Sequence, residues 1–339
     1  MRPLSAAVFG AAGFTGALAA RLLFRHPSFE LTAVTARSDV GRRLDELYPH
    51  HRVPLRLEEL DLERHADGLE AAIVAYPHGA AAELVAELRA RGVRVVDLSA
   101  DFRLRDPAVY AEWYREHPVP ELLAEAVYGL PERYREEIRA CDLVANPGCY
   151  PTATVLALAP LAREGLIGDV VIDAKSGVSG AGRAATEKTH FVTVDENVSP
   201  YGVPRHRHTP EIEQELAALG VDLRVTFVPH LLPLDQGELV SCYVTLDGGP
   251  AGPGSAGANV DALYADAYAG EPFVELVARA PGVRDVRDTN ICRISVHPDR
   301  RTGRVVVFSV IDNLWKGAAS QAVQNLNLMF GRPEDEGIA

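Results

Sequence analysis

A glycine-rich turn between an apolar strand and a helix constrains the fold of this chain more than any other stretch. Residues 4–9 predict a short buried strand, residues 10–16 read G-A-A-G-F-T-G, and residues 17–25 predict a helix. A dinucleotide-binding fingerprint requires this order, because its glycines let the backbone approach a pyrophosphate at the helix N-terminus. The spacing G-x-x-G-x-x-G is a variant of the commoner G-x-G-x-x-G, and a tight connection without a ligand is the alternative.

The second predicted strand, residues 30–35, narrows the choice of cofactor. It leads into Thr35, Ala36, Arg37 and Ser38, where an NAD-specific site would place an acid for the ribose 2′-hydroxyl. An arginine flanked by hydroxyls suits a 2′-phosphate, so the sequence favours NADP over NAD. The alternative is that Arg37 only marks the solvated end of a strand.

Strands and helices continue to alternate through the first half of the chain. Residues 71–76, 93–98 and 143–145 predict strands, and residues 80–91 predict a helix. This alternation favours a doubly wound parallel sheet, whose ligands bind at the carboxyl ends of the strands. Side chains that follow strand ends should therefore face one cleft: Pro77, His78, Ser99, Arg103 and Cys149. We expect His78 to contact the cofactor through its backbone or to cap the next helix.

The sequence N-P-G-C-Y-P-T at residues 146–152 places Cys149 where a strand gives way to a helix. Unpaired N–H groups and the helix dipole favour an anion there, so we expect the thiol to be shifted toward the nucleophilic thiolate. Cys141, Cys242 and Cys292 lie in apolar or mixed runs typical of buried cysteine. The absence of a C-x-x-C pair fits neither a disulfide scaffold nor a zinc site.

Two loops in the second half carry anion-binding residues. A predicted strand at 170–175 leads into S-G-V-S-G-A-G-R, a loop of small residues framed by Lys175 and Arg183. Residues 201–211, Y-G-V-P-R-H-R-H-T-P-E, precede a predicted helix at 212–219, with Thr209 expected as its cap and Pro210 in its first turn. No further ligands for a metal are evident, so we expect no metal and interpret this loop as a base beside an anion clamp.

The remaining strands, at 224–229, 238–246, 292–297 and 305–311, predict a mixed or antiparallel sheet in a second domain, with a hairpin turn at 299–303. We expect an NADP-binding domain over residues 1–148, completed by residues 316–339 with a helix at 317–329. The catalytic and oligomerisation domain should span residues 149–315. The glycine- and proline-rich residues 248–254 suggest a flexible loop.

The net charge of −13 argues against nucleic acid and anionic membranes as partners. The sequence shows neither a signal peptide nor a run long enough to span a bilayer, so we expect a cytoplasmic protein.

Taken together, these motifs closely resemble the N-acetyl-gamma-glutamyl-phosphate reductases, which belong with the aspartate-semialdehyde dehydrogenases. The resemblance covers almost the whole chain and includes D-L-S-A-D-F-R at 97–103, H-R-H-T-P-E-I at 206–212 and D-N-L-W-K-G-A at 312–318. It implies NADPH-dependent reduction of an acyl phosphate in arginine biosynthesis, through a cysteine thioester, by a dimer or tetramer.

The resemblance also implies roles for individual residues. Cys149 matches the nucleophile, a histidine of the H-R-H motif is the acid/base, for which we choose His208, and Asn313 matches a residue near the nicotinamide. The predicted cofactor contacts are Gly10, Gly13, Phe14, Thr15, Gly16, Thr35, Arg37, Ser38, Pro77, His78, Ser99, Ser179, Gly180 and Asn313. The predicted substrate contacts are Arg103, Lys175, Arg183, Tyr201, His206 and Arg207, with Arg205 a further candidate.

Two other readings stay open. The chain could reduce a related acyl phosphate, either aspartyl phosphate or a carrier-protein-linked aminoadipyl or glutamyl phosphate. The N-P-G-C-Y-P form of the cysteine turn favours the free N-acetyl substrate, since the carrier-dependent branch tends to lack it. From a different class, the chain could be a non-catalytic NADPH-binding regulator. A hydrolytic aldehyde dehydrogenase is disfavoured, and it would turn over without phosphate.

Overall fold

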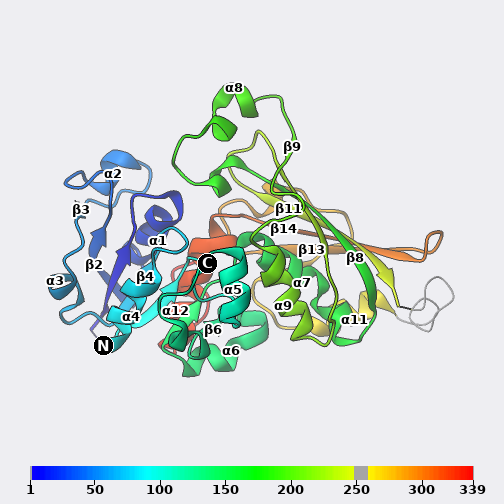
Figure 1. Ribbon diagram of the computed structural model, residues 1–339, viewed down its shortest axis with the longest axis horizontal. Coiled ribbons are helices and arrows are strands. Elements are labelled where there is room, and N and C mark those ends of the chain that lie inside the picture. The colour runs from blue at the N-terminus through cyan, green and yellow to red at the C-terminus, as the bar shows by residue number, and fades with distance from the viewer. Residues whose placement is uncertain (1, 248–258, 339) are drawn as a thin grey trace. The chain divides into compact units, whose positions relative to one another are not determined.

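The computed structural model describes residues 2–247 and 259–338, so the predicted loop at 248–254 lies outside the described residues. The chain forms two compact units (Figure 1). Unit 1 comprises Met1–Gly148 and Ala318–Ala339, and unit 2 comprises Cys149–Gly317. Among the described residues, no helix is both long enough and apolar enough to cross a membrane.

The described part of unit 1 is built on a parallel sheet with strand order β3-β2-β1-β4-β5-β7-β6. The strands are β1 (Leu4–Phe9), β2 (Phe29–Thr35), β3 (Leu57–Glu58), β4 (Ala71–Val74), β5 (Arg94–Asp97), β6 (Val127–Tyr128) and β7 (Leu143–Ala145). Strand order reverses between β1 and β4. This reversal is the point at which doubly wound sheets bind ligands, and the predicted fold class is confirmed.

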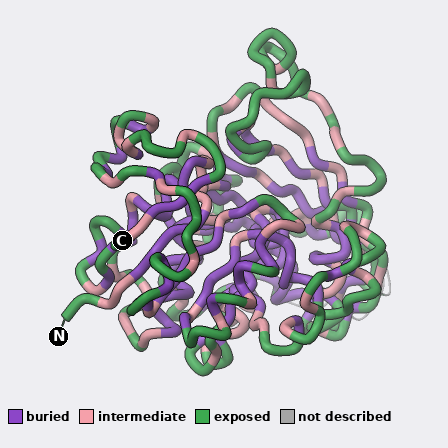
Figure 2. Tube along the Cα trace, turned by 60° about the vertical axis from the view of Figure 1, so that its left-hand side comes forward, coloured by how far each residue is buried: buried purple, intermediate pink, exposed green. Residues whose placement is uncertain are grey.

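Helices connect these strands. They are α1 (Phe14–Phe24), α2 (Leu44–Leu47), α3 (Leu62–Ala66), α4 (Ala82–Ala90), α5 (Pro107–Trp113), the 3-10 turn η1 (Pro120–Ala124), α6 (Pro131–Ala140) and α12 (Ser320–Met329). All four residues of β4 are buried, as expected for a central parallel strand that is covered on both faces. Figure 2 shows the buried strands inside a shell of exposed loops and helix faces.

The described part of unit 2 contains a mixed sheet with strand order β12-β13-β14-β11-β8-β10-β9. The strands are β8 (Ile167–Ser176), β9 (Ser199–Pro200), β10 (Thr226–Leu231), β11 (Glu238–Leu246), β12 (Val274–Leu276), β13 (Cys292–Asp299) and β14 (Arg304–Ile311). The helices and turns are α7 (Cys149–Arg163), η2 (Val178–Ala181), η3 (Glu187–Thr189), α8 (Phe191–Val194), α9 (Thr209–Ala217), α11 (Val260–Ala267) and η5 (Val283–Val286). The predicted turn joins β13 to β14, since Gly303 N–H donates to the Asp299 carbonyl.

Helix α7 packs against β11 and β14 and is buried along almost its whole length. Its interior proline, Pro160, has no N–H to donate to the carbonyl of Leu156, one turn earlier. The Tyr268 hydroxyl donates to that carbonyl instead, and the Tyr264 hydroxyl donates to the Ala157 carbonyl at 2.5 Å. Tyr264, inside α11, and Tyr268, which follows its last residue, thus satisfy the backbone of the helix that carries Cys149.

Two helix starts differ from the predictions. Thr209 is not the cap of α9: it is the first helical residue, its hydroxyl has no hydrogen bond, and His208 stands at the cap position. The predicted helix at 317–329 is divided, because Trp315–Ala319 form a π-helical turn in which Gly317 N–H donates to the Asp312 carbonyl. Single π-helical turns of this kind are frequent at functional sites.

Candidate active site

The glycine turn after β1 is held by backbone contacts that only glycine permits. Gly10 has φ +98°, and a Cβ there would lie 2.6 Å from the Ala75 carbonyl oxygen. A Cβ on Gly16 would lie 2.3 Å from the Gly10 carbonyl oxygen, whereas one on Gly13 would meet nothing closer than 4.0 Å. Gly10 and Gly16 therefore close the turn, and Gly13 leaves open space at the start of α1.

Helix α1 presents its first N–H groups, those of Phe14, Thr15 and Gly16, beside this open space. At the end of β2, the Arg37 guanidinium lies 4.7 Å from the ring centroid of Tyr76, which follows β4. Both Arg37 and Ser38 are exposed. The helix N-terminus and a cation therefore flank the reversal point of the sheet, an arrangement suited to a phosphorylated dinucleotide.

A buried acidic network fixes the next two strand ends of unit 1. The Asp101 carboxylate accepts the N–H groups of Gly79, Ala81 and Ala82, which secures the turn before α4. The Ser99 hydroxyl donates to Asp97 at 2.6 Å, and burial raises the pKa of Asp97 to about 7. Ser99 is thus engaged inside this network.

His78 and Arg103 also connect strand ends. His78 Nδ1 accepts the Ala100 N–H at 2.9 Å. The buried Arg103 guanidinium donates to the carbonyls of Leu98 and Asn146, each at 2.8 Å, and Asn146 accepts a further hydrogen bond from Asn325. The structure gives Arg103 a role in holding the turn before Cys149, and this role differs from the substrate contact that the sequence predicted.

In unit 2, Cys149 is the first residue of α7 and is partly exposed. The π-helical turn brings Gly317 against it: a Cβ on Gly317 would lie 2.8 Å from the Cys149 Cβ. Glu238, the first residue of β11, lies near Cys149, and neither of its carboxyl oxygens has a hydrogen-bond partner among the described residues. This carboxyl is fully buried, and burial raises its pKa from 4.5 to about 8.

Aromatic and imidazole rings surround the residue after Cys149. The ring centroid of Tyr150 lies 5.9 Å from that of His206, 5.8 Å from that of His208 and 5.3 Å from that of Phe227. The Tyr201 hydroxyl donates to the Tyr150 hydroxyl at 3.1 Å. We call these side chains, together with Cys149 and Glu238, the thiol cluster: Cys149, Tyr150, Tyr201, His206, His208, Phe227 and Glu238.

The two histidines of the cluster differ in their surroundings. Burial, with Arg207 nearby, lowers the pKa of His206 to about 4, so its imidazole is neutral at physiological pH. His206 Nδ1 accepts the backbone N–H of His208 at 3.1 Å, which ties this ring to its own loop. A histidine that is neutral and tied to its own loop is less suited to take up a proton near neutral pH. His208 therefore stays the predicted acid/base.

Three predicted cofactor contacts converge in unit 2. The Asn313 amide accepts the Gly237 N–H at 2.7 Å and donates to the Ser179 hydroxyl at 3.0 Å. A Cβ built on Gly180 would lie 3.6 Å from the Asn313 side-chain nitrogen. Asn313 thus positions the small-residue loop, and its predicted contact with nicotinamide stays a prediction.

Lys175 does not join the thiol cluster. On β8 it pairs with Leu239, whereas its neighbour Ser176 pairs with Glu238. Successive side chains of a strand point to opposite faces, so Lys175 lies on the other face of the sheet from Glu238. Its ammonium contacts the Asp173 carboxylate at 2.5 Å. The arginines at 183, 205 and 207 are exposed on the loops around α9 and η2.

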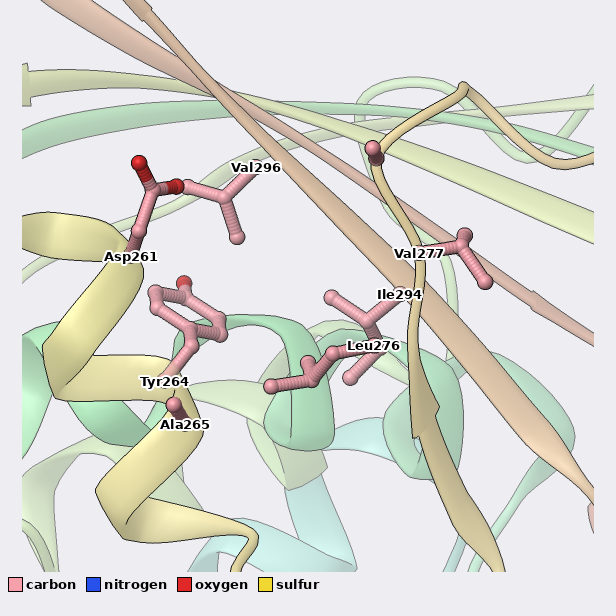
Figure 3. A pocket seen from close by; sticks show the side chains of 8 residues that line it. Asp261, Tyr264, Ala265, Leu276, Val277, Ile294 and Val296 are labelled. Carbon is pink, nitrogen blue, oxygen red and sulfur yellow. The ribbon is translucent and has the colours of Figure 1, made fainter.

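The structure also holds an apolar pocket that contains none of the predicted site residues. It lies between α11, β12 and β13 and is lined by Asp261, Tyr264, Ala265, Leu276, Val277, Ala278, Ile294 and Val296 (Figure 3).

Sequence reasoning missed Glu238 as a site residue. The one available signal was an acid at the first position of an otherwise apolar strand, directly after a glycine.

Family models match both units of the chain. The semialdehyde dehydrogenase NAD binding domain matches residues 5–141, and the semialdehyde dehydrogenase dimerisation domain matches residues 149–313. Aspartate semialdehyde dehydrogenase II from Vibrio cholerae, complexed with ASA, has the same fold with a TM-score of 0.73 at 19% identity, covering 98% of this chain and 99% of that one. The Candida albicans aspartate semialdehyde dehydrogenase with NADP gives a TM-score of 0.70 at 15% identity, covering 97% and 98%. The chain belongs to the semialdehyde dehydrogenase family.

Curated relatives show which group within the semialdehyde dehydrogenase family the chain is similar to. The chain is 51% identical to the N-acetyl-gamma-glutamyl-phosphate reductase of Desulforudis audaxviator, over 98% of this chain and 96% of the relative. It is also 51% identical to the enzyme of the same name from Rubrobacter xylanophilus, over 99% and 98% of the two chains. Within the family, the chain is a member of the N-acetyl-gamma-glutamyl-phosphate reductase group.

Proposed function

We propose that this protein reduces N-acetyl-gamma-glutamyl phosphate with NADPH to N-acetylglutamate 5-semialdehyde and phosphate, a step of arginine biosynthesis. The observation that carries this proposal is the identity of about one residue in two, over nearly the full length, to reductases of that name. The thiol cluster supports it, because a cysteine at a helix N-terminus is suited to attack an acyl carbon.

NADPH fits the residues present in unit 1. The open space at Gly13 and the first N–H groups of α1 would hold the pyrophosphate, and Arg37 with Ser38 would hold the 2′-phosphate. In unit 2, Ser179 and Gly180 would approach the nicotinamide end, with Asn313 holding their loop. When bound, the cofactor supplies the hydride that reduces the thioester carbon.

The chain's own residues would carry the covalent steps. The Cys149 sulfur attacks the acyl carbon, forming a thioester as phosphate leaves with the electron pair of its C–O bond. His208 would exchange the proton of the hemithioacetal oxygen that forms on reduction. Backbone N–H groups at the start of α7 would stabilise the negative oxygen of the tetrahedral intermediates. Arg183, Arg205 and Arg207 remain the candidates for the phosphate and the substrate carboxylate.

The reverse reaction tests this function. Wild-type protein should reduce NADP with N-acetylglutamate 5-semialdehyde only when phosphate is present, and Cys149→Ser should lose at least about 10³-fold in rate. Activity with aspartate semialdehyde or a carrier-linked aldehyde, but not with the N-acetyl compound, would reject the substrate assignment. Turnover without phosphate would indicate a hydrolytic enzyme. NADPH binding without turnover of any semialdehyde would indicate a regulator.

The assembly and location are part of this proposal. The match of residues 149–313 to a dimerisation domain supports self-association, and we propose a dimer or tetramer in the cytoplasm. Light scattering of the purified protein distinguishes these sizes from a monomer.

A further inference from the structure

Every polar group of Asn146, in the turn after β7, has a hydrogen-bond partner. Its N–H donates to the Asp97 carbonyl at 2.8 Å, and its carbonyl accepts a hydrogen bond from Arg103 Nε at 2.8 Å. Its side-chain oxygen accepts the Asn325 amide at 3.0 Å, and its side-chain nitrogen donates to the Ala318 carbonyl at 3.4 Å. Asn146 has no exposed surface. A buried asparagine that is bonded through its backbone and its side chain holds the turn around it in one arrangement.

Asn146 also connects the cysteine turn with the π-helical turn. Its side chain donates to the Ala318 carbonyl, and the preceding residue, Gly317, approaches Cys149. A Cβ on Gly317 would lie 2.8 Å from the Cys149 Cβ. The two segments therefore meet at two points, one at Asn146 and one at the nucleophile. Because the packing between them leaves no room, a shift of Asn146 would also shift the backbone that leads to Cys149.

Asn325 of α12 holds the Asn146 side chain. Its Nδ2 donates to the Asn146 side-chain oxygen at 3.0 Å and to the Gly129 carbonyl at 2.9 Å. Gly129 makes room for this amide, because a Cβ there would lie 2.6 Å from the Asn325 nitrogen. Asn325 is fully buried. The amide is thus confined to a place in which it donates both hydrogen bonds at once.

A second asparagine of α12 offers a comparison. Asn327 is also fully buried, and its Nδ2 donates to the carbonyls of Glu334 at 3.2 Å and Glu336 at 2.9 Å. Each of the two amides therefore donates to two oxygen atoms inside unit 1. They differ in what they hold. Asn327 holds the C-terminal segment, whereas Asn325 holds the residue that leads to the nucleophile.

We propose that Asn325 is a positioning residue for the Cys149 nucleophile and acts through Asn146, an inference that rests on the proposed function. Attack on an acyl carbon requires the sulfur at a fixed distance and angle, and a misplacement of about 1 Å can cost about 100-fold in rate. The N–H groups at the start of α7 stabilise a thiolate or an oxyanion only where the turn presents the sulfur to them. Asn325 keeps the turn in that place and exchanges no proton in the reaction.

Alkylation of Cys149 by iodoacetamide tests this positioning without any substrate. Peptide mass spectrometry separates Cys149 from the other three cysteines. Asn325→Ala should lower the alkylation rate at pH 7 about tenfold, because a displaced turn stabilises the thiolate less well. Asn327→Ala is the matched control and should keep the wild-type rate, although it also removes two hydrogen bonds of a buried amide. A wild-type rate in Asn325→Ala, or an equal fall in both variants, overturns the proposal.

Turnover separates positioning from a general loss of stability. Asn325→Ala should lower kcat about tenfold with little change in KM, whereas Asn327→Ala should leave both unchanged. The double variant Asn146→Ala/Asn325→Ala should be no slower than Asn146→Ala alone, since Asn325 acts through Asn146. If the effects of the two substitutions on kcat multiply instead, the route through Asn146 is wrong.

Asn325→Asp repeats both measurements if circular dichroism shows that Asn325→Ala does not fold. A carboxyl group has the shape of the amide but carries at most one proton in place of two N–H donors. Alkylation and kcat should fall in this variant too, and wild-type values would overturn the proposal. Slower alkylation in Asn325→Ala, in a protein whose wild type turns over no semialdehyde, would keep the positioning role of Asn325 and reject the proposed function.

Discussion

The hydroxyl of Tyr201 donates a hydrogen bond to the hydroxyl of Tyr150, 3.1 Å away, so the loop before the two histidines is tied to the residue that follows Cys149. Burial raises the pKa of both phenols, which keeps them neutral and able to maintain this bond throughout the physiological range. The contact links the N-terminus of α7 with the segment that carries His206 and His208.

Tyr201→Phe should remove this bond while keeping the ring contact with His206. We expect a loss of about 1 kcal/mol in the free energy of unfolding and a three- to tenfold fall in kcat/KM, because the histidine loop is less well held. Urea unfolding and steady-state kinetics measure the two effects. Tyr243→Phe is the control, since Tyr243 is a half-buried tyrosine of β11 outside the thiol cluster. Equal kinetics for the two variants would contradict the expected coupling.

Tyr268→Phe should destabilise unit 2 through helix α7. The change leaves the Leu156 carbonyl without a donor, because Pro160 cannot supply one. An unsatisfied buried carbonyl costs about 1–3 kcal/mol, which urea unfolding should show as a lower midpoint at an unchanged slope. Replacing Pro160 with Ala in the same variant restores an N–H and should recover part of the loss. No recovery would contradict the role given to the Tyr268 hydroxyl as donor to the Leu156 carbonyl.

Two glycines of the turn after β1 should respond differently to alanine. In Gly16→Ala the new Cβ would meet the Gly10 carbonyl at 2.3 Å, so we expect a lower melting temperature. In Gly13→Ala the Cβ meets no protein atom closer than 4.0 Å, and the fold should be unchanged. The methyl group would instead occupy the space proposed for the pyrophosphate, and the Kd for NADPH should rise at least about tenfold. Unchanged NADPH affinity in Gly13→Ala would contradict the cofactor placement.

The buried Asp97 should make stability depend on pH. Its pKa is about 7 in the folded protein and 3.8 when unperturbed, so the folded state binds an extra proton between pH 4 and 7. The free energy of unfolding should therefore fall as pH rises through this window, by at most about 1.4 kcal/mol per pH unit. Asp97→Asn should remove this pH dependence of the free energy of unfolding. Asp142→Asn, at an exposed position, should leave it in place. Urea unfolding at pH 5, 6 and 7 measures the slopes, and identical slopes in wild type and Asp97→Asn would refute the assignment.

The sequence predicted elements whose pattern is local. Residues 4–9 and 238–246 are strands with the predicted bounds, because a run of apolar and β-branched residues between turn residues has few alternatives. The glycine turn and the cysteine turn were likewise predictable, since glycine and proline restrict the backbone directly.

Other features depend on which elements pack together. The alternating pattern of a strand does not reveal which of its two faces packs against α7. For this reason Lys175 of β8 was assigned to the site from the sequence, and Glu238 of β11, which lies on the opposite face of the sheet, was not. Thr209 carries the side chain of a helix cap, but the contacts of the histidine loop begin the helix one residue earlier. The division of the predicted helix at 317–329 follows from the close approach of Gly317 to Cys149, a contact between distant parts of the chain.

The central claim, that Cys149 carries the acyl group during reduction, is tested most directly by mass spectrometry without a reductant. N-acetyl-gamma-glutamyl phosphate is mixed with the protein in the absence of NADPH, and both the released phosphate and the modified peptides are measured. We predict a burst of about one phosphate per active site and one N-acetylglutamyl group on the peptide that contains Cys149. An unmodified Cys149, or a burst that persists in Cys149→Ser, would contradict the account.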